Sequence, residues 1–210
     1  MTDFLLLDKS DKKPAMISMR DLEIHFGIIY RSHLTFLNDA MYMKAIANCP
    51  YILRFDWLAV ENYALAEEFK DQLSKGMIAD VYIKWIDDIM GYGLFANADL
   101  PAGTFVGEYT GVLRQLSRQH RDHNDYCLHY PTRFWSWNYM AIDALHEGNV
   151  TRFINHSDDP NLDPKCLVVG RVLHLVFITK KFVPRDSQLT FNYGPDFWSK
   201  TKTTNLNDMT

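Results

Sequence analysis

Four short segments of this chain carry residue types that could bind a ligand and position a reacting group. In chain order they read GYGLFA (Gly91–Ala96), GEYTG (Gly107–Gly111), GNVTRFINHSDDPN (Gly148–Asn161) and QLTFNYG (Gln188–Gly194). Glycine lets a backbone approach a ligand closely, and an asparagine amide or a tyrosine hydroxyl both donates and accepts hydrogen bonds. The recurrence of these residues indicates a ligand-binding site rather than packing alone.

Each segment by itself has an ordinary structural interpretation. Gly91-Tyr92-Gly93 is typical of a turn, and it lacks the third glycine and the following helix of a dinucleotide-binding site. Tyr126 alone would be a core tyrosine, and an isolated Asn155-His156 pair would be a turn. The order and spacing of all the segments together are therefore the specific signal.

In that order and spacing the set resembles the SET domain, the fold of protein lysine methyltransferases that use S-adenosylmethionine. The resemblance covers about residues 80–198, which is more than half of the chain. It implies a mostly β fold with α additions, in which small sheets surround a pseudoknot formed by the segments around Asn155 and Tyr193. Because chains rarely thread, this feature comes from the resemblance alone. The implied activity is protein-lysine N-methyl transfer.

The resemblance also assigns roles to individual residues. Tyr193 and Tyr109 are expected to be catalytic, as hydroxyl groups that line the lysine channel and orient the amine. The residues expected to hold S-adenosylmethionine are Gly91, Tyr92, Gly93, Tyr126, Arg152, Asn155, His156, Phe197 and Trp198. The last two could equally form a simple hydrophobic cap. No metal ligands are expected, because the cysteine-rich segments of many family members are missing and Asp158 stands where a cysteine is usual.

The elements that must position these residues change in character along the chain. Residues 1–77 predict helices: Asn38–Asn48 is helix-compatible with Asn38 as its N-cap, and apolar residues recur at helical spacing from Phe55 to Leu73, before Gly76. From residue 81, VYIKWID and later short apolar runs separated by Gly and Pro predict strands. The predicted organisation is a helical N-terminal section (1–77), a SET domain (78–198) and a polar C-terminal tail (199–210).

The bulk composition excludes several classes of protein. The 210 residues carry a net charge of −4, which disfavours direct binding to nucleic acid because phosphate binding needs a basic surface. Three cysteines without a C-x-x-C pair predict neither a disulfide framework nor a structural zinc site, and hence a reducing, intracellular setting. No apolar run is long enough to span a membrane, and the first residues do not read as a usual secretory signal peptide.

The finer resemblance is to short bacterial SET proteins such as the chlamydial nuclear effectors, on the segments NDYC, GNVTRFINHSDDPNL and YGPDFW. It implies a basic protein substrate, either a histone or a bacterial histone-like protein, and delivery into a host cell with action in its nucleus. The N-terminal helical section is a candidate homodimer interface. Two alternatives remain open: a SET-fold peptide- or chromatin-binding module without turnover, and a scaffold in which only the N-terminal section acts.

Phe191 occupies the position that the family treats as a phenylalanine/tyrosine switch for product specificity. Phenylalanine leaves room beside the amine, so di- or trimethylation is expected. Replacing it by tyrosine (F191Y) should shift the products towards monomethyl-lysine, measured by mass spectrometry of a methylated protein substrate. An unchanged product distribution would show that Phe191 does not have this role.

Overall fold

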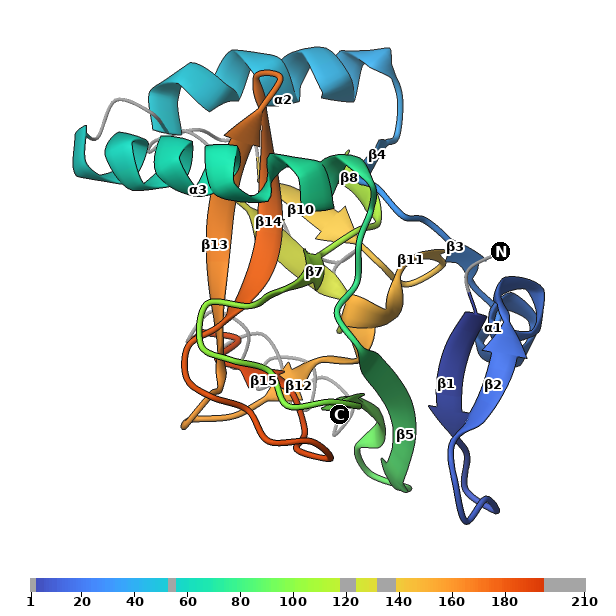
Figure 1. Ribbon diagram of the computed structural model, residues 1–210. Helices are drawn as coiled ribbons and strands as arrows, with labels where there is room; N and C mark the ends of the chain where they lie inside the picture. Colours follow the sequence, from blue (N-terminus) through green and yellow to red (C-terminus); the bar gives the residue numbers. More distant parts are fainter. Residues whose placement is uncertain (1–2, 53–55, 118–123, 132–138, 195–210) are drawn as a thin grey trace, which may run out of the picture.

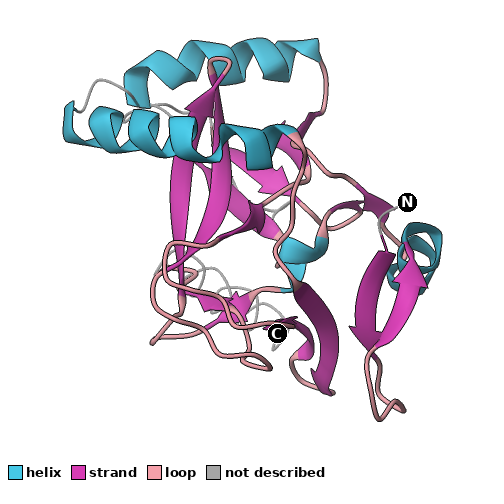
Figure 2. Cartoon of the chain, in the orientation of Figure 1, coloured by secondary structure: helices cyan, strands magenta, loops and turns pink. Residues whose placement is uncertain are grey.

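The computed structural model describes residues 3–52, 56–117, 124–131 and 139–194. The two longest helices lie at one end and short strands fill most of the rest (Figures 1 and 2). The helices are α1 (Met19–Phe26), α2 (Asp39–Ile52), α3 (Asp56–Ser74) and a short 3-10 helix, η1 (Val150–Phe153). The strands are β1 (Asp3–Leu7), β2 (Ala15–Ser18), β3 (Ile29–Tyr30), β4 (Thr35–Phe36), β5 (Val81–Asp87), β6 (Gly91–Ala96), β7 (Phe105–Glu108), β8 (Val112–Gln115), β9 (Cys127–Tyr130), β10 (Met140–Asp143), β11 (Glu147–Gly148), β12 (Asn155–His156), β13 (Leu162–Val169), β14 (Val172–Thr179) and β15 (Thr190–Phe191). The prediction of a mostly β fold with few helices is confirmed.

The described strands form several small sheets rather than one large one. Two four-stranded sheets have the orders β2-β1-β5-β6 and β4-β8-β10-β9, and a third sheet has the order β13-β14-β7. Two-stranded pairs, β11-β3 and β12-β15, complete the set. Strands from the first 36 residues pair with strands of the later segment. Strand β1 pairs with β5, β3 with β11 and β4 with β8, all in parallel.

The prediction that residues 1–77 are helical is therefore wrong for the first half of that section. Residues 3–36 contribute four strands and only one helix, α1. The run DFLLL has no helical periodicity, and its alternate side chains, Phe4 and Leu6, are buried while Leu5 and Leu7 are partly exposed. Its strand partner β5 lies about 75 residues later, so local pattern alone could not identify the pairing. Because β1, β3 and β4 pair with strands that follow residue 77, the segments before and after this residue do not form two independent units.

The two longer helices of the N-terminal section confirm the second half of the prediction. Asn38 caps α2, because its side-chain oxygen accepts the main-chain N–H of Met41 at 3.0 Å. Gly76 ends α3 with a left-handed φ of 58°, and the N–H groups of Gly76 and Met77 return to the carbonyls of Leu73 and Gln72. This double return is a Schellman motif, which requires a residue without a side chain at that position.

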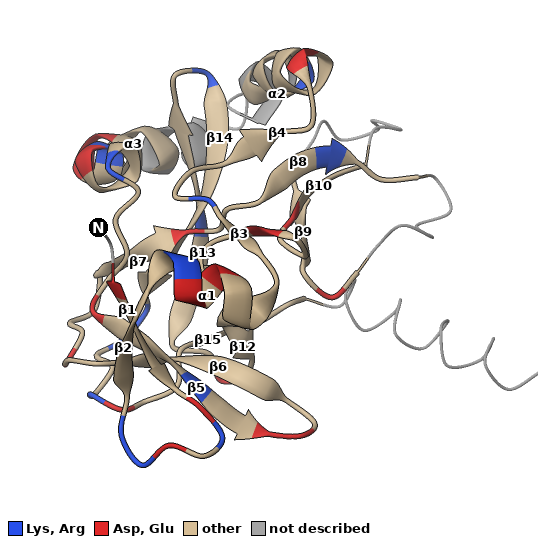
Figure 3. Cartoon of the chain, turned by 90° about the vertical axis from the view of Figure 1, so that its right-hand side faces the viewer, with Lys and Arg blue, Asp and Glu red and all other residues tan. Residues whose placement is uncertain are grey.

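Helix α3 packs on the long hairpin β13–β14 through its own small core. The side chains that meet there are buried and apolar: Ala66, Phe69, Leu73, Phe105, Leu167, Val176 and Ile178. Figure 1 shows α2 and α3 at the same end of this hairpin, and Figure 3 shows them on opposite sides of β14. The larger core lies between the sheets, and in the described residues it runs from β1 to β15.

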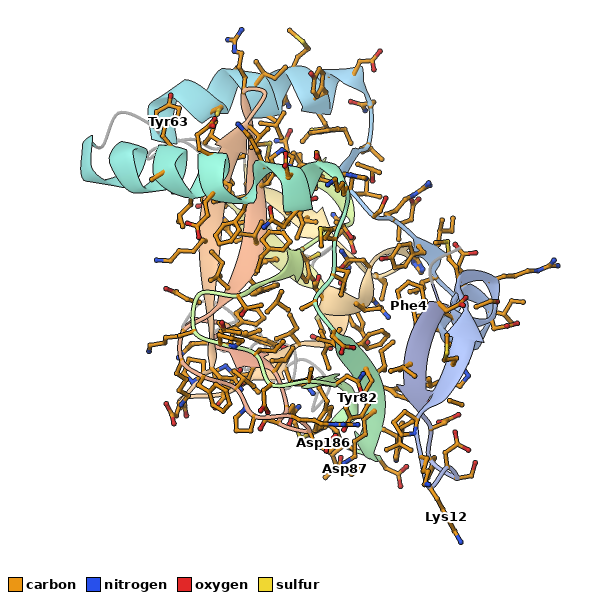
Figure 4. The ribbon with its side chains drawn as sticks, in the orientation of Figure 1. Phe4, Lys12, Tyr63, Tyr82, Asp87 and Asp186 are labelled. Atoms are coloured by element: carbon orange, nitrogen blue, oxygen red, sulfur yellow. The ribbon has the colours of Figure 1, made fainter. Side chains whose placement is uncertain are left out.

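A side-chain hydrogen bond to the segment before β15 also holds strand β5 in place. The hydroxyl of Tyr82 donates to Asp186 at 3.0 Å, in the segment that leads to β15, and Figure 4 shows the two side chains together. The patterns around β8 and β13 were not recognised as strands from sequence. The polar residues Arg114 and Gln115 end β8, where pairing with β10 outweighs their polarity.

Two segments that are distant in sequence meet at β12 and β15. Asn155 lies opposite Thr190 and His156 opposite Phe191 in a parallel pair. Asn161 reinforces the junction, because its amide donates to the Gln188 carbonyl at 2.8 Å and its side-chain oxygen accepts the Thr190 N–H at 2.9 Å. This is the association of the two motif segments that the sequence resemblance implies.

Replacing Asn161 by alanine (N161A) should remove both of these hydrogen bonds. Each is worth about 1 kcal/mol net, and a buried partner is left unpaired, so the free energy of unfolding should fall by about 2–3 kcal/mol. Urea denaturation measures this change. The matched control is Asn97→Ala, which removes one exposed hydrogen bond, to Asp80, and should cost less than about 1 kcal/mol. Equal losses in the two variants would contradict the clamp at Asn161.

Candidate active site

Strand β6 and strand β12 meet at Gly93 with no room for a side chain. A Cβ atom built on Gly93 would lie 2.7 Å from Ile86 Cδ1, 2.9 Å from Gln188 Nε2 and 3.1 Å from Asn155 Nδ2. The Asn155 amide donates to the main-chain carbonyl of Tyr92 at 3.3 Å. Glycine at position 93 is thus needed so that the Asn155 amide can lie against the strand.

Tyr193 is held against the same segment by its hydroxyl and by its backbone. Its hydroxyl donates to the Ile154 carbonyl at 2.9 Å, and its main-chain N–H donates to His156 Nδ1 at 3.2 Å. The ring lies 4.7 Å from Phe191 and 5.4 Å from His156, measured between centroids. The structure therefore brings the predicted catalytic tyrosine beside the predicted cofactor residues Asn155 and His156.

A line of aromatic rings connects Tyr193 to Tyr109. The centroids of Phe191 and Phe177 are 4.8 Å apart, and those of Phe177 and Tyr109 are 6.1 Å apart. Tyr109 is 6% exposed, and its hydroxyl donates to the Tyr126 carbonyl at 2.7 Å. Both predicted catalytic hydroxyls thus donate their protons to main-chain carbonyls of other segments.

Burial raises the pKa of Tyr193 and the pKa of Tyr109 well above the ordinary value of 10.0. The cause is desolvation of the charged form, and for Tyr109 the nearby Tyr193 adds repulsion. Both phenols are therefore neutral at any physiological pH. They can orient a group by hydrogen bonding, but they cannot act as phenolate bases.

Arg152 fixes the position of Tyr126. Its guanidinium lies 3.9 Å from the centroid of the Tyr126 ring, within the range of a cation–π contact. The same guanidinium donates to the carbonyls of Ala144 at 2.9 Å and Leu145 at 3.2 Å. Burial lowers the pKa of Arg152, although an arginine remains charged. Arg152 thus ties η1, the turn after β10 and the segment before β9 together.

Two of the predicted cofactor residues have structural explanations of their own. The side chain of Tyr92 is taken up by the N-terminal section, because its hydroxyl donates to Asp8 at 2.6 Å and its ring packs on Phe26 and Trp85. Only its main chain lies at Asn155. Gly91 has a left-handed φ of 68° with open space at its Cβ position, so the backbone conformation accounts for this glycine.

His156 presents its backbone away from its strand partner. In the β12–β15 pair, the Ser157 N–H donates to the Phe191 carbonyl. Main-chain groups of one strand alternate in direction, so the N–H and carbonyl of His156 point to the other side.

A buried polar network behind the site was not predicted from the sequence. Asn149 and Thr151 are each 1% exposed and donate to the Glu108 carbonyl, at 2.9 and 3.2 Å. The Glu108 carboxylate faces His174 at 2.6 Å. These bonds fix the residue next to Tyr109 and the start of η1. The Gly148-Asn149 pair belonged to the recognised motif, but its partner is distant in sequence and carried no local signal.

Phe197 and Trp198 lie outside the described residues. Among the residues that the structure describes, no group of three or more His, Cys, Asp or Glu side chains could hold a metal ion. No helix within the described residues is long and apolar enough to cross a membrane.

Residues 91–194 match the family model described as SET domain. A histone-lysine N-methyltransferase, H3 lysine-36 specific, of Cryptococcus neoformans var. neoformans is 32% identical over 163 residues, covering 76% of this chain and 18% of that protein. The solved structure of ctPRC2 in an autoinhibited conformation bound to S-adenosylmethionine has a TM-score of 0.51 and 30% identity, covering 63% of this chain and 18% of that chain. The structure of ATXR5 in complex with histone H3.1 mono-methylated on R26 has a TM-score of 0.65 at 14% identity, covering 84% and 86%, and shows the fold.

The chain spans less than a fifth of the length of the Cryptococcus relative and of the ctPRC2 chain. Other curated relatives come from Chaetomium thermophilum, mouse, human and Arabidopsis thaliana, so these matches do not extend to the bacterial effectors. The family model covers all of the residues described above from Gly91 to Gly194. Through this segment the chain belongs to the SET-domain family of protein lysine methyltransferases.

Proposed function

We propose that this protein is an S-adenosylmethionine-dependent protein-lysine N-methyltransferase. The observation that carries the proposal is the position of the Tyr193 hydroxyl, which is held on the Ile154 carbonyl directly before the Asn155-His156 pair. Tyr193 thus lies between the two halves of the site. One half is the wall formed by the Asn155 amide and the main chain beside it, and the other is the aromatic lining that ends in Tyr109.

The residues of the first wall fit the cofactor. The side-chain oxygen of Asn155 accepts no hydrogen bond from a described residue, so it can accept one from the amino group of the ligand's methionine part. When bound, S-adenosylmethionine supplies an electrophilic methyl group on a positively charged sulfur.

The two tyrosines can orient the attacking amine. Because each hydroxyl donates its proton to a carbonyl, its oxygen retains lone pairs that accept a hydrogen bond from an amine N–H. Two such acceptors hold a neutral lysine amine so that its lone pair is directed along the channel. Most of the rate then comes from alignment rather than from covalent catalysis by the protein.

The amine must lose its proton before it can attack. A lysine in water has a pKa near 10.4, so almost none is neutral at pH 7. Burial among Tyr109, Phe177 and Phe191 lowers the lysine pKa through desolvation, because the charged form loses its hydration. The site thus favours the reactive form without needing an ionised base.

The proposed substrate is a histone or a bacterial histone-like protein. Two observations support this proposal. The relatives are named as histone-lysine N-methyltransferases, and the chain's net charge of −4 suits a basic partner. Di- or trimethylation is proposed because Phe191 brings no hydroxyl to the channel. Export to a host cell, action in its nucleus and dimerisation through the N-terminal section stay predictions from the sequence resemblance.

Gly93→Ala should weaken the binding of S-adenosylmethionine by at least about tenfold, because the new methyl group displaces the Asn155 amide. Isothermal titration calorimetry measures the Kd. The matched control is Gly170→Ala in the β13–β14 turn, where φ is also left-handed, at 59°, but the Cβ position is open. It should lose stability through backbone strain and keep its affinity. Similar affinities in both variants would contradict the proposed role of Gly93.

Tyr193→Phe should lower methyl transfer to purified core histones by about 100-fold or more, while cofactor affinity stays within a few-fold. The variant loses the oxygen that orients the amine but keeps the ring. Incorporation of labelled methyl groups measures the rate, and Tyr63→Phe, at an exposed tyrosine of α3 (Figure 4), is the control with expected full activity. Full activity in Tyr193→Phe would refute the mechanism. A parent protein that binds histones and cofactor without transfer would be a binding module.

The rate at saturating cofactor should rise about tenfold per pH unit from pH 7 to about 9, because the fraction of neutral substrate lysine rises in that way. The raised pKa of Tyr109 and of Tyr193 keeps both phenols protonated throughout this range. No decline from phenol ionisation is therefore expected below pH 10. A fall in kcat centred below pH 9, with the protein still folded by circular dichroism, would contradict this.

A further inference from the structure

A second cleft lies on the opposite side of β6 from the Asn155 wall, where the N-terminal hairpin meets the connection between α3 and β5. Its volume is about 600 Å³, within the range of small-molecule sites. Residues from β1, β3, β5 and the connection at positions 75–80 line it, and none of Asn155, His156, Tyr109 or Tyr193 does. It is therefore separate from the candidate active site.

The cleft arises from the way in which β1 and β5 pair. Their parallel register begins at Leu5 and Tyr82. The preceding residues of β1, Asp3 and Phe4, pair only with β2 on the far side. The amino ends of the two strands thus diverge, and the connection after Gly76 passes over the gap. Figure 4 shows Phe4 at this end of β1.

The floor of the cleft is apolar and rigid. The partly exposed side chains of Ile78, Ala79 and Val81 form it, and the buried core residues Ile83, Leu94 and Val150 lie directly beneath them. Phe4 and Tyr30 form one wall, with ring centroids 5.0 Å apart. A space of this size over a packed floor is uncommon, since protein interiors leave few voids larger than a water molecule. It suits a ligand with an apolar body.

The polar groups around this floor are mainly acidic. Asp3 makes no hydrogen bond or ion pair with a described residue, and Asp80 uses one carboxylate oxygen for Asn97. The hydroxyl of Tyr30 has no described partner either, and burial raises the pKa of Tyr30 to about 12, so it stays a neutral donor and acceptor. Lys75 is the single basic residue among those that line the cleft. Two carboxylates against one ammonium favour a cationic ligand.

We propose that this cleft binds an organic ammonium compound: an apolar or aromatic body on the Ile78–Ala79–Val81 floor, with a positively charged nitrogen at Asp3 and Asp80. Tyr30 would accept a further hydrogen bond from that nitrogen. The claim does not depend on the proposed methyl transfer, because no residue of the active site takes part.

The core residues beneath the floor also connect the cleft to the active site. Leu94 follows Gly93 directly in β6, and Val150 begins η1, which continues to Arg152. An occupant would therefore lie over the back of two elements whose front faces hold the predicted cofactor residues.

Tryptamine is a suitable probe, with indole-3-propionate as its matched anion of similar size. Isothermal titration calorimetry on the full chain should give saturable tryptamine binding with a Kd on the order of 0.1–1 mM, and at least about tenfold weaker binding of the anion. The double variant Asp3→Asn and Asp80→Asn should weaken tryptamine binding at least about fivefold, whereas Asp163→Asn on β13 should leave it unchanged.

A second variant tests the location through shape. Ala79→Trp fills part of the cleft and should abolish tryptamine binding while thermal unfolding remains cooperative. Equal binding of the cation and the anion, unchanged binding in the double variant, or no saturable tryptamine binding at 10-fold above the expected range would overturn the proposal. Displacement of tryptamine by S-adenosylmethionine would place the amine in the active site and would overturn it as well.

Discussion

The parallel pairing of β12 with β15 is the interaction on which the rest of the site depends. Each strand has only two residues, so the ladder alone contributes little stability. Side chains supply the rest: Asn161 bonds two main-chain groups of the later segment, and the Tyr193 hydroxyl bonds the Ile154 carbonyl. The proposed cofactor wall and the proposed catalytic tyrosine are therefore held by the same few bonds, and a change that loosens one loosens the other.

Main-chain carbonyls have a second role in this arrangement. Those of Ile154 and Tyr126 accept the protons of Tyr193 and Tyr109, and this orients both hydroxyl oxygens. Burial keeps the phenols neutral by raising their pKa, so the lining stays uncharged around a lysine that must also lose its charge. The polar network of Asn149, Thr151 and Glu108 then fixes the backbone from behind. A low-dielectric channel in which both phenol protons are held by main-chain carbonyls is a preorganised setting for alignment.

The N-terminal section is part of the same fold rather than an attachment to it. It gives two strands to one sheet and one strand to each of two others, and α3 covers the β13–β14 hairpin. Basic and acidic residues are interspersed in the turn of its hairpin and in α1 (Figure 3). The side chain of Tyr92 joins this section to the Gly91–Gly93 segment through Asp8 and Phe26.

The sequence alone determined the motif residues, the strand VYIKWID, and helix α2 with its Asn38 cap, because their signals are local: alternation of apolar residues and a capping side chain. It also determined the family, through the spacing of four segments. Only the tertiary structure decided that DFLLL is a strand, that Tyr92 faces the N-terminal section, and that Gly93 is required by Asn155 and Gln188. Each of these rests on a partner about 60 to 95 residues away, and such pairings leave no periodic trace in the chain itself.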